Sequence, residues 1–240
     1  MIYKRAYLLL ILFATFLAAS SNAIAQTQSS TNQEMTFWAG TDSSGSPFVF
    51  ELQPSGKFRY IPATGIVSKG NWKQNGNSIE MEVNGKFVKF SGVVESEQMK
   101  GEASSKRGLK WTWAAAKQPL VISNVAPPYP PIARAARVIG NVIVEVNIDA
   151  EGNVTSPHVT SGHPLLQQSA ADAARRWKFA TIKEPGKVRT ARIFFYFRGE
   201  VVVKNKNQEV VAPIFLSPYQ AEIRFIPLTL DYSMTYTTAK

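Results

Sequence analysis

Short runs of alternating apolar and polar residues, separated by turn residues, fill the chain from Met35 to Ala114. Two Asn-Gly pairs, Asn75-Gly76 and Asn84-Gly85, lie between such runs. Both residues of an Asn-Gly pair accept a positive φ, so the pair favours a tight β-hairpin. Strands spaced by roughly 8–12 residues, without a helical period, are typical of an antiparallel meander. We therefore expect a small up-and-down barrel or an open sandwich.

The recurring Phe-x-Phe and Gly-x-Trp cadence of this region resembles that of lipocalin-like bacterial domains. We assign residues 35–117 to such a β-rich domain. A packed interior would favour an adaptor, whereas an open apolar cavity would favour carriage of a small molecule or lipid. The residues expected to line that cavity are Phe48, Phe58, Trp72 and Phe90.

The N-terminus has the features of an export signal. Lys4 and Arg5 precede an apolar run from Ala6 to Ala19, and Ala23-Ile24-Ala25 supplies the small residues of a cleavage site. The apolar run is shorter than the roughly 20 residues that a membrane-spanning helix needs. We predict a signal peptide over 1–25, a flexible leader over 26–34 and a periplasmic protein. The alternative is an uncleaved inner-membrane anchor.

A proline cluster around Pro127 and Pro131 divides the chain, because no helix continues across it. Beyond it the pattern predicts a short helix, two strands joined by a turn at Ala150–Asn153, a helix over Leu165–Phe179, and a third strand over Arg189–Arg198. We assign residues 118–200 to this second domain. Its expected fold is α+β, with one or two helices covering a three-stranded antiparallel sheet.

The residues that fill this order resemble the TonB C-terminal domain family over about residues 127–198. Each piece is weak alone, but their order is specific. The pieces are Pro128-Tyr129-Pro130, Arg137 to Gly140, Val142 to Val146, Ile148 to Val154, Thr160 to Leu166, Ala170 to Phe179 and Ile193 to Phe197.

The resemblance implies a docking function. In that family a short segment of an outer-membrane receptor adds as a strand to the third strand of the domain, which is an exposed sheet edge. The partner expected here is a TonB-dependent outer-membrane receptor or another envelope protein. The residues implied to bind it are Tyr129, Pro130, Arg189, Ala191, Arg192, Ile193, Phe195 and Phe197. We expect Trp177 and Phe179 to be core anchors, and Arg189, Arg192 and Arg198 to lie on a solvated strand face rather than to clamp an acidic peptide.

The chain departs from a full-length energy transducer. It has a β-rich domain in place of a long proline-rich spacer, so docking and force transfer are separate hypotheses. Residues 201–240 form a β-rich tail with strand-like runs at 201–203, 210–211, 214–216, 223–226 and 228–234. Because a Val-rich run begins just after Gly199, we hypothesise that the tail pairs with the third strand and covers the docking edge. The alternative is a satellite hairpin.

Composition argues against an enzyme and against nucleic acid. The chain has no cysteine, and its two histidines, His158 and His163, lack a recognisable catalytic or metal-binding spacing. We expect no cofactor and no metal. The net charge of +10 is spread along the chain rather than gathered in a stripe, which favours a solvated surface or an anionic envelope partner. A homodimer, and an apolar ligand in the N-terminal domain, stay open.

Overall fold

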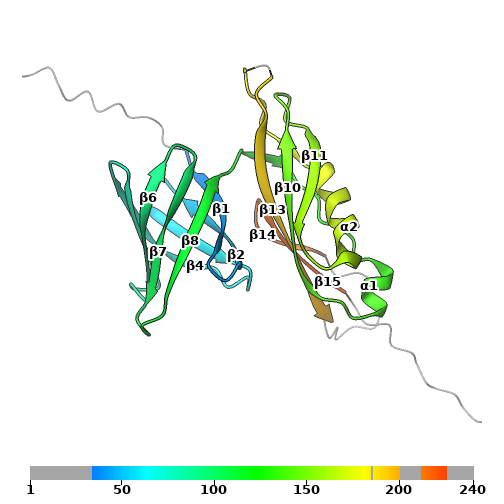
Figure 1. Ribbon diagram of the computed structural model, residues 1–240, viewed down its shortest axis with the longest axis horizontal. Helices are drawn as coiled ribbons and strands as arrows, with labels where there is room; N and C mark the ends of the chain where they lie inside the picture. Colours follow the sequence, from blue (N-terminus) through cyan, green and yellow to red (C-terminus); the bar gives the residue numbers. More distant parts are fainter. Residues whose placement is uncertain (1–33, 185, 201–211, 226–240) are drawn as a thin grey trace, which may run out of the picture. The chain divides into compact units, whose positions relative to one another are not determined.

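Eight antiparallel strands form a closed barrel in the computed structural model, which describes residues 34–184, 186–200 and 212–225 (Figure 1). Each strand pairs with the next, and β8 pairs back with β1, so the barrel alternative is confirmed over the open sandwich. The strands are β1 (Thr36–Asp42), β2 (Pro47–Leu52), β3 (Lys57–Pro62), β4 (Ser68–Asn75), β5 (Ser78–Val83), β6 (Val88–Glu95), β7 (Gln98–Ser105) and β8 (Lys110–Lys117).

The two Asn-Gly pairs mark turns, as predicted. Gly76 has a φ of 56°, and Asn84 and Gly85 have φ values of 51° and 62°. The first pair joins β4 to β5, and the second lies between β5 and β6. The positive φ that these residues tolerate reverses the chain tightly enough for neighbouring strands to pair.

Aromatic rings fill the barrel interior. Phe50 is fully buried, and its ring centroid lies 4.5 Å from that of Phe48, 5.3 Å from that of Phe58, and 5.2 Å from that of Phe90. Three of the four expected cavity residues are therefore packed together. The fourth, Trp72, is half-buried and donates a hydrogen bond from Nε1 to the Gln53 carbonyl at 2.9 Å. This packing favours the adaptor over the ligand carrier.

The second domain is built on a five-stranded sheet with the order β11-β10-β13-β15-β14, and helix α2 runs along it (Figure 1). Its elements are α1 (Pro131–Ala135), β10 (Gly140–Ile148), β11 (Val154–Ser161), α2 (Pro164–Arg175), β13 (Arg189–Glu200), β14 (Ile214–Ser217) and β15 (Gln220–Phe225). A separate pair joins β9 (Val121–Ser123) to β12 (Lys178–Phe179).

The three predicted strands are present as β10, β11 and β13, and both helices are present, but the prediction of a three-stranded sheet was wrong. The tail adds β15 and β14 to the sheet, and β15 runs parallel to β13. The predicted signal peptide and leader, apart from Glu34, and the tail runs at 201–203, 210–211 and 228–234 lie outside the described residues.

Local contacts explain why the β10–β11 turn forms. The Asp149 carboxylate accepts hydrogen bonds from the Asn153 backbone at 2.7 Å and from its side-chain amide at 2.9 Å, and these bonds hold the pKa of Asp149 below its usual value. Gly152 has a φ of 83°, and a Cβ there would lie 2.0 Å from the Phe179 carbonyl oxygen. Only glycine fits this close approach.

Trp177 and Phe179 are core anchors, as expected. Trp177 is fully buried, its Nε1 donates a hydrogen bond to the Val125 carbonyl at 2.8 Å, and its ring meets that of Phe195 edge-on. Phe179 is 2% exposed. The end of α2 is thereby held against β13.

Candidate docking edge

Strand β13 was expected to be an open edge, but both of its sides are occupied over most of its length. One side pairs with β10 from Arg189 to Phe197. On the other side, the Phe194 backbone N–H donates to the Tyr219 carbonyl at 2.9 Å, and β15 is in register from there. The Arg192 N–H is capped by the side-chain oxygen of Gln118 at 2.8 Å. Unpaired backbone groups on a buried strand are costly, and these partners satisfy them.

The hypothesis that the tail covers this strand is confirmed, although by residues other than the Val-rich run that prompted it. The covering strand is β15, in which Gln220 is the register partner of Phe194 and Ile223 that of Phe197. The pairing is parallel, and β14, which runs antiparallel to β15, leads into it opposite Phe194 in the middle of β13. β14 is the outer neighbour of β15, and it exposes about half of Ile214 and two-fifths of Phe215.

The expected binding residues on one face of β13 are buried beneath the helices. Ile193, Phe195 and Phe197 are fully buried and Ala191 is 3% exposed. Tyr129 lies across the seam between β13 and β15, because its ring contacts both Phe197, at a centroid distance of 5.2 Å, and Phe225, at 4.7 Å.

Tyr129 and Pro130 fix the start of the short helix. The Tyr129 hydroxyl donates to the Val138 carbonyl at 2.5 Å, and partial burial raises its pKa. Pro130 is the N-cap residue of α1, and its carbonyl accepts from the Arg134 N–H. With β15 in place, Tyr129, expected to bind the partner, packs against the sheet instead.

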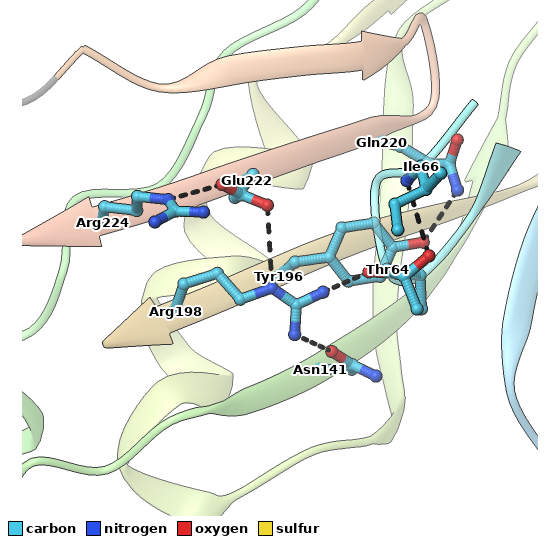
Figure 2. A network of polar contacts seen from close by, with 9 residues as sticks. Thr64, Ile66, Asn141, Tyr196, Arg198, Gln220, Glu222 and Arg224 are labelled. Carbon is cyan, nitrogen blue, oxygen red and sulfur yellow. Dashed lines mark hydrogen bonds and ion pairs between the residues drawn. The ribbon is translucent and has the colours of Figure 1, made fainter. Parts of the chain in front are cut away.

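A polar network covers the other face of the β13–β15 pair (Figure 2). The Gln220 side-chain amide donates to the Tyr196 hydroxyl at 2.8 Å and to the Ile61 carbonyl at 2.9 Å. The Arg198 Nε lies 3.7 Å from the Glu222 carboxylate, and its Nη2 donates to the Ala63 carbonyl. Burial raises the pKa of Tyr196 above its ordinary value. Gln220 and Arg198 therefore each bind two separate parts of the chain.

The three arginines of β13 are bonded within the molecule, so the expectation of a simply solvated face was wrong. Arg189 Nη2 donates to the carbonyls of Ala180 at 2.6 Å and Asp149 at 3.2 Å. Arg192 forms an ion pair with Glu145 at 2.5 Å. Their long side chains reach neighbouring elements and satisfy backbone carbonyls or a carboxylate there.

Sequence reasoning missed Gln118, Tyr219, Gln220 and Glu222, which complete this site. One signal was available. Ile193 to Phe197 is apolar or aromatic at every position, and such a run is typical of a strand buried on both faces. That signal predicts a covering layer without identifying the residues that supply it.

The two histidines lie in separate elements. His163 caps the N-terminus of α2, where its Nδ1 accepts from the Leu165 N–H at 3.2 Å, and His158 lies exposed on β11. Within the described ranges, no group of three or more candidate metal ligands occurs, and no helix is long and apolar enough to cross a membrane. A hollow of about 490 Å³ over β4–β6 is lined by Trp72 and Phe90, two of the four residues expected to line a cavity, and by the exposed Lys73–Glu80 ion pair.

Comparison with known proteins places the sheet in a family. Residues 125–198 match the model of the Gram-negative bacterial TonB protein C-terminal domain. Protein TonB of Xanthomonas campestris pv. campestris (strain B100) is 44% identical over 73 residues, which are 29% of this chain and 33% of that protein. Protein TonB of Vibrio cholerae serotype O1 is 41% identical over 66 residues, or 27% of each chain. Protein TonB of Klebsiella pneumoniae is 30% identical over 99 residues, or 40% of each.

These matches span between 27% and 40% of the relatives' lengths and leave the barrel outside the resemblance that the family model covers. The matched residues include the elements from α1 through most of β13. Residues 125–198 belong to the TonB C-terminal domain family.

Proposed function

We propose that this chain is a TonB-like docking protein of the cell envelope, linked to TonB-type transport and without catalytic activity. Its partner is an outer-membrane transport receptor, or another envelope protein, that adds an extended segment to β13. The observation that supports this most directly is the pairing of β13 with β15. The strand already accepts an extended segment from outside residues 125–198, in the register Phe194 with Gln220.

β15 also indicates which partner segment would fit. Its Ala221, Ile223 and Phe225 are buried beside the apolar residues of β13, whereas Gln220 and Glu222 reach Tyr196 and Arg198 on the other face. A segment that replaces β15 must satisfy the same groups. We therefore propose a parallel partner strand that alternates apolar residues with an amide or a carboxylate.

Replacement requires β15 to leave first. Docking is then a competition within the molecule, and the apparent affinity for a partner is reduced by the fraction of molecules in which β13 is covered. Residues such as Tyr129, Phe195 and Phe197 would contact the partner strand where they now contact β15.

Site-specific photo-crosslinking in the envelope tests the docking surface. A photoreactive amino acid at Thr190, an exposed residue of β13 that precedes the β15 pairing, is expected to form adducts with an outer-membrane transport protein. The matched control is Thr155, an exposed residue of the opposite edge strand β11. Adducts of equal yield at both positions, or none at Thr190, would contradict docking at β13.

Export to the periplasm is part of the proposal. Cleavage after Ala25 predicts that the purified mature protein begins at Gln26, which intact-mass measurement checks. A protein that still begins at Met1 and stays with the inner membrane would support the anchored alternative.

A further inference from the structure

The barrel has a second apolar surface, on its outside. Phe37 and Ala39 of β1, Val49 of β2 and Ile61 of β3 do not belong to the aromatic cluster of the barrel interior. They belong instead to the core that contains Phe194 and Tyr196 of β13 and Tyr219, the residue before β15. Val49 and Ile61 are both fully buried. The face of β13 and β15 opposite the helices is thus covered by barrel strands.

The barrel contacts the covering segment directly. The Ile61 carbonyl accepts a hydrogen bond from Gln220, and the Phe37 ring lies 5.4 Å from that of Tyr219, the residue before β15. A Cβ built on Gly65, in the β3–β4 loop, would meet the Leu216 side chain of β14 at 3.5 Å. Barrel strands β1 and β3 therefore both contact the tail, and the β3–β4 loop leaves no free space beside Leu216.

The barrel also contacts the covered strand. Arg198 of β13 donates to the Ala63 carbonyl and pairs with Glu222 of β15, and its guanidinium lies over the Tyr196 ring at 5.1 Å (Figure 2). Gln220 joins Tyr196 of β13 to the Ile61 carbonyl of the barrel. β13, β15 and the end of β3 are thus held by one set of bonds, and withdrawal of β15 removes the Gln220 bond to the barrel.

We propose that the barrel is an intramolecular clamp that holds β15 on β13 and so sets how often the docking strand is uncovered. The effect of the clamp on docking rests on the proposed function, but the contact between the barrel and β15 does not depend on that function. A contact made only when β15 is in place stabilises the covered state, and it lowers the affinity for any competing strand by the same factor. If the contact between the barrel and β15 weakens, or if another partner binds the barrel there, β13 is uncovered more often and can bind a competing strand.

Amide hydrogen exchange on the full chain, without any partner, tests the clamp. Val49→Ser weakens the outer apolar surface without entering the barrel interior, and it is expected to raise the exchange rate of the β15 amides by roughly ten-fold. The matched control is Val93→Ser, because Val93 is an outward residue of β6 that is 38% exposed. It should leave the β15 amides unchanged. The β5 and β6 amides should stay protected in both variants.

Exchange of β15 that is unchanged in Val49→Ser, or raised equally in Val93→Ser, would overturn the clamp. If Val49→Ser also exposes β5 and β6, the milder Ile61→Val decides, with a few-fold faster exchange at β15 expected and wild-type exchange contradicting the proposal. The crosslinking at Thr190 is independent. If no adducts form at Thr190 but the β15 amides exchange as expected, docking at β13 is contradicted and the clamp is supported.

Discussion

The two halves of the barrel wall differ on their outer face. Strands β1 to β3 bury much of their outer face as well as their inner face, with every residue of β2 buried, whereas β4 to β8 mostly alternate between buried and exposed positions. Alternation is what a small barrel in water requires. An isolated barrel would leave the buried outer residues of β1 to β3, such as Val49 and Ile61, exposed to water. The difference shows that three of the eight strands serve two cores, their own and that of the docking sheet.

The largest expected effect comes from truncating a residue shared by the two cores. Ile61→Ala removes a fully buried side chain between β3 and the sheet, and it should lower the free energy of unfolding by about 2–5 kcal/mol. Ile66→Ala, in the following loop, truncates a side chain that is 73% exposed and should change stability by less than about 0.5 kcal/mol. Urea denaturation compares the two variants. Similar losses would mean that Ile61 is not a core residue.

The next largest effect comes from breaking an ion pair on the β1–β3 side of the barrel rather than one on the β4–β8 side. Glu51 of β2 has a side chain only 5% exposed and pairs with Arg59 at 2.5 Å, so Arg59→Ala leaves a buried carboxylate without its cation. We expect a loss of about 1–3 kcal/mol, measured by urea denaturation. The Lys73–Glu80 pair joins β4 and β5 in solvent, and Lys73→Ala should have no measurable effect. A reversed order of the two variants would break the distinction between the halves.

A third prediction concerns the sheet rather than the barrel, and it tests whether the tail competes with a docking partner for β13. Deletion of residues 205–240 leaves β13 without β15 and should raise the affinity for a docking partner by on the order of ten-fold, because the competition within the molecule is lost. Titration calorimetry with a receptor identified by crosslinking measures this. The control is Thr155→Ala on β11, which should leave affinity unchanged. Equal affinity of the deleted and intact chains would show that β15 does not compete.

The smallest effect is a change of stability at high pH. Burial raises the pKa of Tyr60 to about 12, inside the barrel, and raises those of Tyr196 and Tyr219 at the sheet. Folded pKa values above the unfolded value near 10 mean that the stabilisation is complete below pH 10 and is lost as the pH rises further. Absorbance at 295 nm should show these three tyrosines ionising above the range of a free tyrosine, which ionises near pH 10. Ionisation of all three near pH 10 in the folded protein would contradict it.

Local signals predicted much of this fold, because they act between neighbours. The Asn-Gly turns and the Asp149–Asn153 turn depend on residues close in the chain, and each was expected from its own sequence. The partners of β13 depend on contacts between distant segments. Gln118 and Gln220 are unremarkable glutamines in the sequence, and only the fold brings them to Arg192 and Tyr196.

The prediction that the tail covers β13 was confirmed, but it assigned the covering strand to the wrong residues, because that contact also joins distant segments. Apolar content drew attention to the run after Gly199, whereas the covering strand contains Gln220, Glu222 and Arg224. The polar residues of β15 form the network that faces the barrel. An apolar run in the sequence does not predict a strand with such residues. The prediction of a solvated arginine face did not allow for the length of these side chains. Arg189 and Arg198 extend to carbonyls that lie outside their own strand.

The position of β15 near the end of the described chain has a consequence for biogenesis. The barrel strands and β10, β11 and β13 all precede it in sequence, so a chain synthesised from its N-terminus presents them first. Until residue 225 has been made, β13 is an uncovered apolar strand edge of the kind that pairs with other chains. The arrival of β15 thus ends an interval in which the new chain is most exposed to aggregation, and a chaperone that shields extended apolar strands would act in that interval.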